Sequence, residues 1–168
     1  MKANKFRSIG LFAATALIGF VAIAPSAVAE ENSTVWNCQD IGHTQTEPLG
    51  DRDGHSVVTA EFSCRIESGK LDGGVATGLA IWEFDGPNAV MLSGNGFVRK
   101  PGAIVVWNVA EAKFALTMVN GKATGWTVAG RGTWVLGAGD WTSEGGKPFT
   151  WTGKSTGPTQ YSFEVKTQ

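Results

Sequence analysis

The residues with the clearest chemical potential are aromatic, because seven Trp side chains occur in a chain of 168 residues. An indole ring buries a large apolar area and carries one N–H donor. A set of such rings therefore suits either a packed core or a cavity for an apolar or planar ligand. The packed core is the simpler interpretation. If a cavity is present, its candidate lining residues are Phe62, Trp82, Trp107, Trp126 and Trp134.

Acid–base chemistry has one candidate, Glu83, which stands between Trp82 and Phe84 at the end of an apolar segment. Burial against aromatic rings would raise the pKa of this carboxyl group toward a range that is useful in catalysis. The simpler interpretation is that Glu83 marks the outward face of a strand end. The sequence has no GxSxG motif and no arrangement that suggests a catalytic triad. It therefore favours a binding protein over an enzyme.

The two cysteines, Cys38 and Cys64, could bind a metal ion or form a disulfide. Zinc sites usually have paired ligands at short spacing, and the set of Cys38, His43, His55 and Cys64 follows no such pattern. We therefore expect a disulfide between Cys38 and Cys64 and no metal site.

A polar stretch between the cysteines contains Asp51, Arg52, Asp53 and His55. These charges would suit the rim of a site or a modest cation site, although a solvated loop is the simpler interpretation. Elsewhere the charged residues are scattered along the chain, which is typical of an ordinary solvated surface.

Two Gly-containing stretches, Gly94–Val98 and Gly130–Val135, resemble each other. A GxG motif binds phosphate where it opens a helix after a strand, but both stretches lie inside strand-like patterns. We expect their glycines to bend the sheet or to admit a ring from a neighbouring strand. The sequence thus predicts no nucleotide and no other cofactor.

The first 29 residues have the features of an export signal. Lys2, Lys5 and Arg7 precede an apolar run over residues 9–23, and small residues lead to an expected cleavage after Ala29. The run is shorter than the roughly 20 apolar residues that a spanning helix needs. We expect a secreted or periplasmic protein, in a compartment where disulfides persist. Cleavage leaves eleven basic and fifteen acidic side chains, a net charge of −4 with no basic stripe, so a nucleic-acid partner is not expected.

Strands are the elements that must position these residues. Apolar and polar side chains alternate over residues 57–66, 113–118, 126–134, 149–154 and 161–166, which indicates half-buried strands. Residues 75–84, 89–98 and 103–109 are apolar on both faces, so their inward face stays open and a partner subunit could cover the outer one. Between the segments lie turn signals such as Asn120-Gly121, whose residue types favour a type I′ hairpin turn.

About eight strands joined in order predict an all-β fold, either an antiparallel up-and-down barrel or a sandwich. We favour the barrel, because glycines alternating with tryptophans suit a curved wall and closure removes free sheet edges. The expected organisation is a signal peptide at 1–29, an N-terminal segment with a polar loop at 30–55, tethered by the disulfide, and a barrel domain at 56–168.

The Gly-rich part of the chain between residues 121 and 154 contains the runs Gly121-Lys-Ala-Thr-Gly-Trp126, Gly130-Arg-Gly-Thr-Trp134 and Gly137-Ala-Gly-Asp-Trp141. These runs resemble strands of the allene oxide cyclase and dirigent-like barrels. The resemblance covers about a quarter of the mature chain. It implies an eight-stranded antiparallel barrel, often oligomeric, whose apolar cavity steers substrates by shape. None of the functional residues of those families matches a position here.

A shorter run, Gly125-Trp-Thr-Val-Ala129, is similar to a strand of the avidin-like barrels. Both resemblances imply a small barrel with an aromatic interior.

The main expectation is an exported barrel that binds a small apolar or amphipathic ligand in an aromatic-lined cavity. One alternative is a cyclase-like or isomerase-like enzyme that uses Glu83 in the same cavity. The other is an oligomeric structural or interaction module, in which the strands that are apolar on both faces form a subunit interface.

Overall fold

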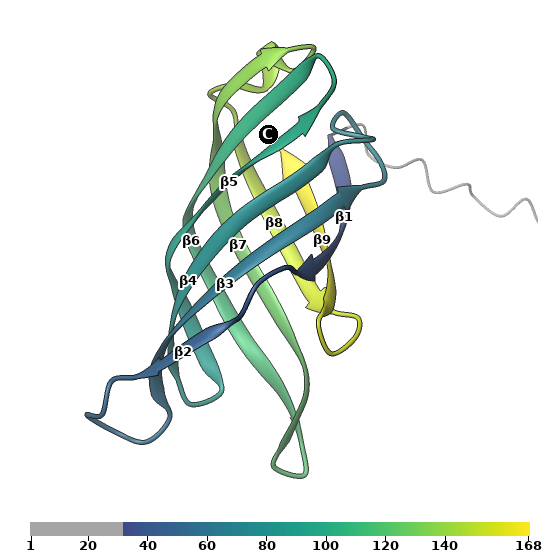
Figure 1. Ribbon diagram of the computed structural model, residues 1–168. Coiled ribbons are helices and arrows are strands. Elements are labelled where there is room, and N and C mark those ends of the chain that lie inside the picture. The colour runs from purple at the N-terminus through teal and green to yellow at the C-terminus, as the bar shows by residue number, and fades with distance from the viewer. Residues whose placement is uncertain (1–31) are drawn as a thin grey trace, which may run out of the picture.

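The computed structural model describes residues 32–168, so the export signal expected at residues 1–29 lies outside the described residues. The described chain is built of strands and one short 3-10 helix (Figure 1). The elements are β1 (Ser33–Asp40), β2 (Gln45–Pro48), β3 (His55–Ile66), β4 (Val75–Asp85), β5 (Asn88–Lys100), β6 (Ala103–Val119), β7 (Lys122–Gly139), η1 (Thr142–Glu144), β8 (Pro148–Ser155) and β9 (Gln160–Thr167).

Eight of these strands form a closed antiparallel barrel. Strands β3 to β9 are neighbours in chain order, and β1 closes the circle by pairing with both β9 and β3. The remaining strand, β2, pairs only with β3. The expected all-β fold and its up-and-down barrel are therefore confirmed.

The strand that closes the barrel, β1, comes from the N-terminal segment at residues 30–55. In β1 the side chains of Thr34, Trp36 and Cys38 are buried and alternate with exposed ones. Cys38 lies opposite Cys64 of β3, and the expected disulfide joins the two residues. This short strand carries little pattern of its own, so its place in the barrel depends on partners far along the chain.

The segments 103–109 and 113–118, expected as two separate strands, are parts of the single strand β6. The pairing of β6 with β7 shifts in register between Val109 and Glu111. Because this irregularity resets the inside–outside alternation, Val109 and Ala112 both belong to the interior although three positions separate them. Because these two segments form one strand, the barrel reaches the expected number of eight strands only with β1.

Several glycines make room for rings, as the sequence predicts. A Cβ atom at Gly78 or Gly96 would overlap the ring of Trp107, and one at Gly132 would overlap the ring of Phe149. At the β6–β7 turn, Asn120 and Gly121 have φ angles of 50° and 76°, which confirms a hairpin turn with positive φ at both central positions.

The two ends of the barrel interior differ. At the upper end in Figure 1, near the β5–β6 turn and η1, the side chains of Ile66, Val98, Val105 and Trp134 are at most 1% exposed. Toward the lower end, which carries the β4–β5 and β6–β7 turns, the inward rings of Phe84, Phe114 and Trp126 are only partly buried. The interior is thus tightly packed above and more open below.

Candidate functional site

A cavity of about 250 Å³ occupies the barrel below its packed upper end. For comparison, an engineered apolar cavity of about 150 Å³ holds one benzene molecule. The space therefore suits a ligand somewhat larger than a single ring. Its aromatic lining consists of Trp36, Phe62, Trp82, Phe84, Trp107, Phe114, Trp126, Phe149, Trp151, Tyr161 and Phe163.

A row of small residues provides part of this space. Ala60 of β3 pairs with Ala80 of β4, and Ala80 pairs with Gly94 of β5, so three neighbouring strands present little or no side chain at one level. Both alanines line the cavity. Larger side chains flank the row, with Phe62 two residues above Ala60 and Trp82 two residues below Ala80.

Four rings from four strands form an arc around the lower part of the cavity. The centroid of Phe114 lies 5.7 Å from Trp82 and 5.3 Å from Trp126. The Trp126 ring lies in turn 5.2 Å from Tyr161, at a tilt of 55°. These separations are in the range of favourable aromatic pairs. The arc gives the cavity a continuous aromatic side.

The side chains with oxygen atoms in the cavity lining gather on the β1 and β9 side. The hydroxyl of Tyr161 donates to Oδ1 of Asp40 over 3.1 Å. Burial and the neighbouring Asp40 carboxylate raise the pKa of Tyr161 well above its usual range, so the phenol stays protonated. Thr44 and Thr159 also line this side.

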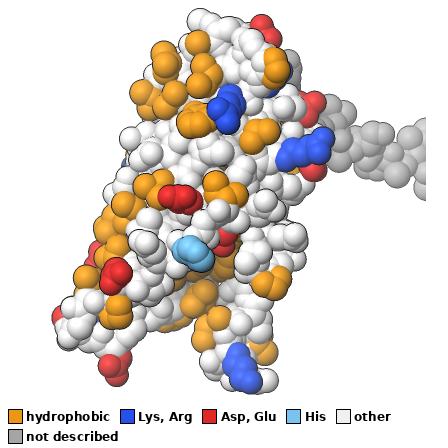
Figure 2. Space-filling model, in the orientation of Figure 1, with side chains coloured by type: hydrophobic (Ala, Val, Ile, Leu, Met, Phe, Trp, Pro, Cys, Tyr) orange, Lys and Arg blue, Asp and Glu red, His pale blue; other side chains and the backbone are white. Residues whose placement is uncertain are grey.

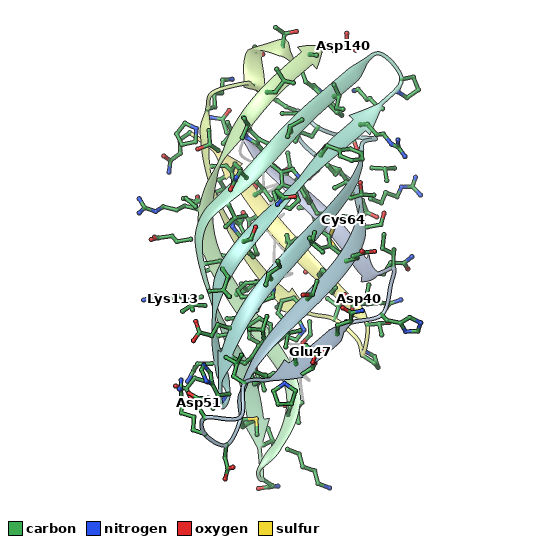
Figure 3. The ribbon with its side chains drawn as sticks, turned by 60° about the vertical axis from the view of Figure 1, so that its left-hand side comes forward. Asp40, Glu47, Asp51, Cys64, Lys113 and Asp140 are labelled. Atoms are coloured by element: carbon green, nitrogen blue, oxygen red, sulfur yellow. A yellow bond between two sulfur atoms is a disulfide. The ribbon has the colours of Figure 1, made fainter. Side chains whose placement is uncertain are left out.

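Asp40 is the only charged side chain in the cavity lining, and it makes no ion pair within residues 32–168. Its position follows from the alternation in β1, where Thr34, Trp36 and Cys38 point inward and Asp40 is next on that face. Figure 3 shows Asp40 where β1 ends. The cavity therefore combines an aromatic wall with one carboxylate that no cation of the described residues neutralises.

Four of the five lining residues proposed from the sequence, Phe62, Trp82, Trp107 and Trp126, are brought together around the cavity. The fifth, Trp134, lies in the packed upper end. Its ring packs 4.6 Å from Phe149, and its Nε1–H donates to Oγ1 of Thr167 over 3.0 Å.

Asp40, Tyr161 and Trp151 also line the cavity, although none of them is a candidate lining residue from the sequence. Tyr161 lay on a predicted inward face, and its alternation could have found it. Asp40 had no such signal, because β1 was not expected to be a strand of the barrel.

Trp107 and Trp151, which both line the cavity, have buried Nε1 atoms that no described residue bonds.

Glu83 faces the outside of the barrel, while its neighbours Trp82 and Phe84 line the cavity. Its Oε1 lies 2.9 Å from Nε2 of His55, and its side chain is 38% exposed. The structure therefore does not bring Glu83 into the cavity, so the placement that an acid–base group would need there is missing. The physical reason is the strict alternation of β4, which turns Glu83 away from the rings on either side of it.

His55 is 8% exposed and lies between two carboxylates, with Nε2 facing Glu83 and Nδ1 facing Asp51. The hydrogen bond to Glu83, and then the one to Asp51, raise the pKa of His55. The hydrogen bond between His55 and Asp51 also lowers the pKa of the Asp51 carboxyl group.

The guanidinium of Arg52 joins this network to the β4–β5 turn by binding both Asp51 and Asp85. It lowers the pKa of Asp85, chiefly through their hydrogen bond. Asp53 lies exposed in the same loop. The polar stretch, for which a rim, a cation site or a solvated loop was expected, thus connects the β2–β3 loop to the end of β4. We call this network of Asp51, Arg52, His55, Glu83 and Asp85 the His55 clamp.

The residues considered as metal ligands are Cys38, His43, His55 and Cys64. The disulfide occupies both sulfur atoms of Cys38 and Cys64. Residues 32–168 contain no group of three or more His, Cys, Asp or Glu side chains that could hold a metal ion.

The fold and the site together define a closed eight-stranded antiparallel barrel with an aromatic-lined internal cavity. No protein-family model, curated protein or solved structure matches the chain. None of the helices within residues 32–168 is long and apolar enough to cross a membrane. Because barrels of this kind serve many purposes, the function has to be argued from the cavity itself.

Proposed function

We propose that the protein is an exported barrel that binds a small apolar or amphipathic ligand in its aromatic cavity. One observation carries the proposal: rings that line the lower part of the interior are only partly buried, in a barrel whose upper end is packed to near-complete burial. The disulfide is consistent with an oxidising compartment. Export as a secreted or periplasmic protein, directed by residues 1–29, belongs to the proposal.

The apolar surface that the rings leave uncovered would stabilise a bound ligand. Burying such surface contributes roughly 25 cal/mol per Å². Phe84, Phe114 and Trp126 are intermediate in exposure although they lie on inward faces. A ligand that fills the space between them would remove that surface from water, and its own apolar surface as well.

The proposal is tested with two variants that place the same ring on opposite faces of β3. Ala60→Phe fills the row of small residues, whereas Thr59→Phe adds a ring outside the cavity lining. Gently purified protein is examined by native mass spectrometry, and quenching of Trp fluorescence by an apolar dye is titrated.

We expect the wild type and Thr59→Phe to retain a bound small molecule or to show dye quenching, and Ala60→Phe to lose both. The proposal fails if the wild type carries no small molecule and apolar dyes leave its Trp emission unchanged. It also fails if folded Ala60→Phe binds the dye as the wild type does.

A second candidate function, self-association, is favoured by the outer face of β5, β6 and β7. Large apolar side chains there are exposed to solvent, including Leu92 at 55%, Val135 at 58% and Leu136 at 55%. Figure 2 shows apolar side chains gathered near the upper end, over this part of the wall. Exposed patches of this kind mark interfaces. Sedimentation velocity that shows a strict monomer at high concentration would reject this candidate.

A further inference from the structure

We infer that the ligand of the cavity is a small organic cation, an ammonium compound whose charged head lies beside Asp40 and against the aromatic rings. This inference rests on the proposed binding function and adds the chemical class of the ligand. Three features carry it: the charge of the lining, the arrangement of the rings and the polar groups that the cavity offers.

The charge of the lining favours a cation. Asp40 contributes a carboxylate on the inward face of β1, and no Lys, Arg or His is present among the lining residues. Within residues 32–168 this carboxylate has no ion-pair partner, and its described hydrogen bond comes from the neutral hydroxyl of Tyr161. In a largely apolar surrounding, a single negative charge attracts a cation more strongly than it would in water, and it repels an anion.

The rings next to Asp40 form a suitable wall for such a head. The ring of Tyr161, whose hydroxyl bonds Asp40, lies 5.2 Å from both Trp126 and Phe163 and 6.4 Å from Phe62. The faces of aromatic rings attract cations, and clustered rings recognise methylated ammonium groups in this way.

Within residues 32–168, no cation lies over any of these rings. The described cation–π contacts, Arg99 over Phe97 and Lys100 over Trp141, involve rings that do not line the cavity.

Few side-chain oxygens in the lining could accept hydrogen bonds, which favours a methylated head over one rich in N–H donors. Besides Asp40, the lining residues with side-chain oxygens are Thr44, Thr159 and Tyr161, and the Tyr161 hydroxyl already donates to Asp40. A quaternary ammonium has no N–H that must be satisfied, and it is less strongly hydrated than a primary amine. The rest of the ligand would occupy the space beside Ala60 and Ala80, which suits a ring or a short alkyl chain.

Three probes of nearly equal shape separate charge from size: benzyltrimethylammonium, its neutral carbon isostere neopentylbenzene, and the anion benzylsulfonate. Their dissociation constants are measured by Trp fluorescence and calorimetry on the wild type, Asp40→Asn and Glu61→Gln. The Asn side chain can still accept the hydrogen bond of Tyr161. Glu61 is the matched control, because it is an exposed acid next to Phe62 that does not line the cavity.

We expect benzyltrimethylammonium to bind the wild type more tightly than benzylsulfonate. Asp40→Asn should lower the affinity for benzyltrimethylammonium by about fivefold or more, which is within the range of one cation–π or ion-pair contact. The same change should leave neopentylbenzene within about twofold, and Glu61→Gln should change neither probe.

The cation assignment is overturned if Asp40→Asn leaves the affinity for the cation unchanged, or if it weakens the neutral isostere equally. Tighter binding of the anion overturns it as well. In these cases, binding of the neutral isostere preserves the proposed function. If none of the three probes binds, the cation assignment falls, and the dye titration and mass spectrometry decide the proposed function separately.

Discussion

The upper and lower ends of the barrel are built from the same alternating strands, yet one is a core and the other is a cavity. From Trp36 to Gln39, β1 pairs with β9 and β3 at once, and at the upper end the buried Trp141 donates its Nε1–H to the carbonyl of Lys70. Toward the lower end, the pairing between β1 and β9 stops at Gln39 and Gln160, and β2 continues beside β3 alone. The wall is therefore complete above and interrupted below.

The difference shows that alternation decides which side chains point inward but not whether they fill the interior. Trp134 and Trp126 lie on the same face of β7, eight residues apart in the sequence, and both were predicted to point inward. Trp134 is 1% exposed and hydrogen-bonded, whereas Trp126 is only partly buried and lines the cavity. We expect the first ring to serve stability and the second to serve binding.

The largest expected effect belongs to the packed end. Trp134→Ala should lower the free energy of unfolding by about 3–5 kcal/mol, because it removes a fully buried ring and leaves a cavity. Urea denaturation at constant pH measures the change. A loss below about 1 kcal/mol would show that the upper end is not the packed core described above.

Removing the disulfide should have the next largest effect. Cys38 and Cys64 are 26 residues apart, and a cross-link over such a loop contributes roughly 3 kcal/mol in the chain-entropy account. The double variant Cys38→Ala/Cys64→Ala should unfold at correspondingly lower urea. As a control, a reducing agent should destabilise the wild type but leave the double variant unchanged. Equal sensitivity of both proteins to the reductant would contradict the expectation.

Gly78→Ala should destabilise the protein by about 1–3 kcal/mol, because its Cβ would overlap the rings of Trp107 and Phe62 and force them to move. Both rings line the cavity, so probe binding should weaken as well. Gly86→Ala is not a suitable control, since the φ of Gly86 is 59° and the substitution there would strain the backbone. A stability equal to wild type would show that the Trp107 ring can shift freely.

At the open end, Trp126→Ala should cost stability much less than Trp134→Ala, on the order of 1 kcal/mol, because its ring is only partly buried. The affinity for apolar probes should nevertheless fall by tenfold or more. Comparing the two variants by urea denaturation and by dye titration tests the division between core and cavity. The division is wrong if Trp126→Ala destabilises as strongly as Trp134→Ala.

The smallest effect concerns the His55 clamp outside the cavity. Glu83 and Asp51 raise the pKa of His55 above its unfolded value of about 6.5, so protonated His55 stabilises the fold. This contribution is fully present below about pH 6.5 and is lost as the pH rises through the raised pKa. Glu83→Gln should flatten this part of the pH profile of unfolding. An unchanged profile would show that the clamp does not depend on the charge of His55.

The barrel could be predicted because alternation and turn residues are local. Strand β3 alternates from Val58 to Ile66, and Asn120-Gly121 specifies a tight turn without reference to the rest of the chain. The disulfide followed from two cysteines and an expected oxidising compartment. Gly96 and Gly132, in the two stretches expected to bend the sheet or admit a ring, lie against the rings of Trp107 and Phe149.

The polar side of the site could not be predicted, because it depends on contacts between distant segments. Asp40 meets Tyr161 only where the first barrel strand pairs with the last, 121 residues further along the chain. The contact of Glu83 with His55 likewise joins two strands, β4 and β3. It places Glu83, the catalytic candidate from the sequence, in the His55 clamp outside the cavity. The length of β6 could not be predicted either, because its alternation is interrupted between Val109 and Glu111. Only the pairing with β7 shows that the strand is continuous.

The seven indole N–H resonances in a ¹H–¹⁵N spectrum test the central contrast most directly, because they report from both ends of the barrel at once. On adding benzyltrimethylammonium or neopentylbenzene, the signals of Trp82 and Trp126 should shift. Those of Trp134 and Trp141, whose Nε1–H groups are bonded in the packed end, should stay in place. Shifts confined to Trp134 and Trp141, or no shift of any indole signal at saturating probe, would contradict an open aromatic cavity below a closed core.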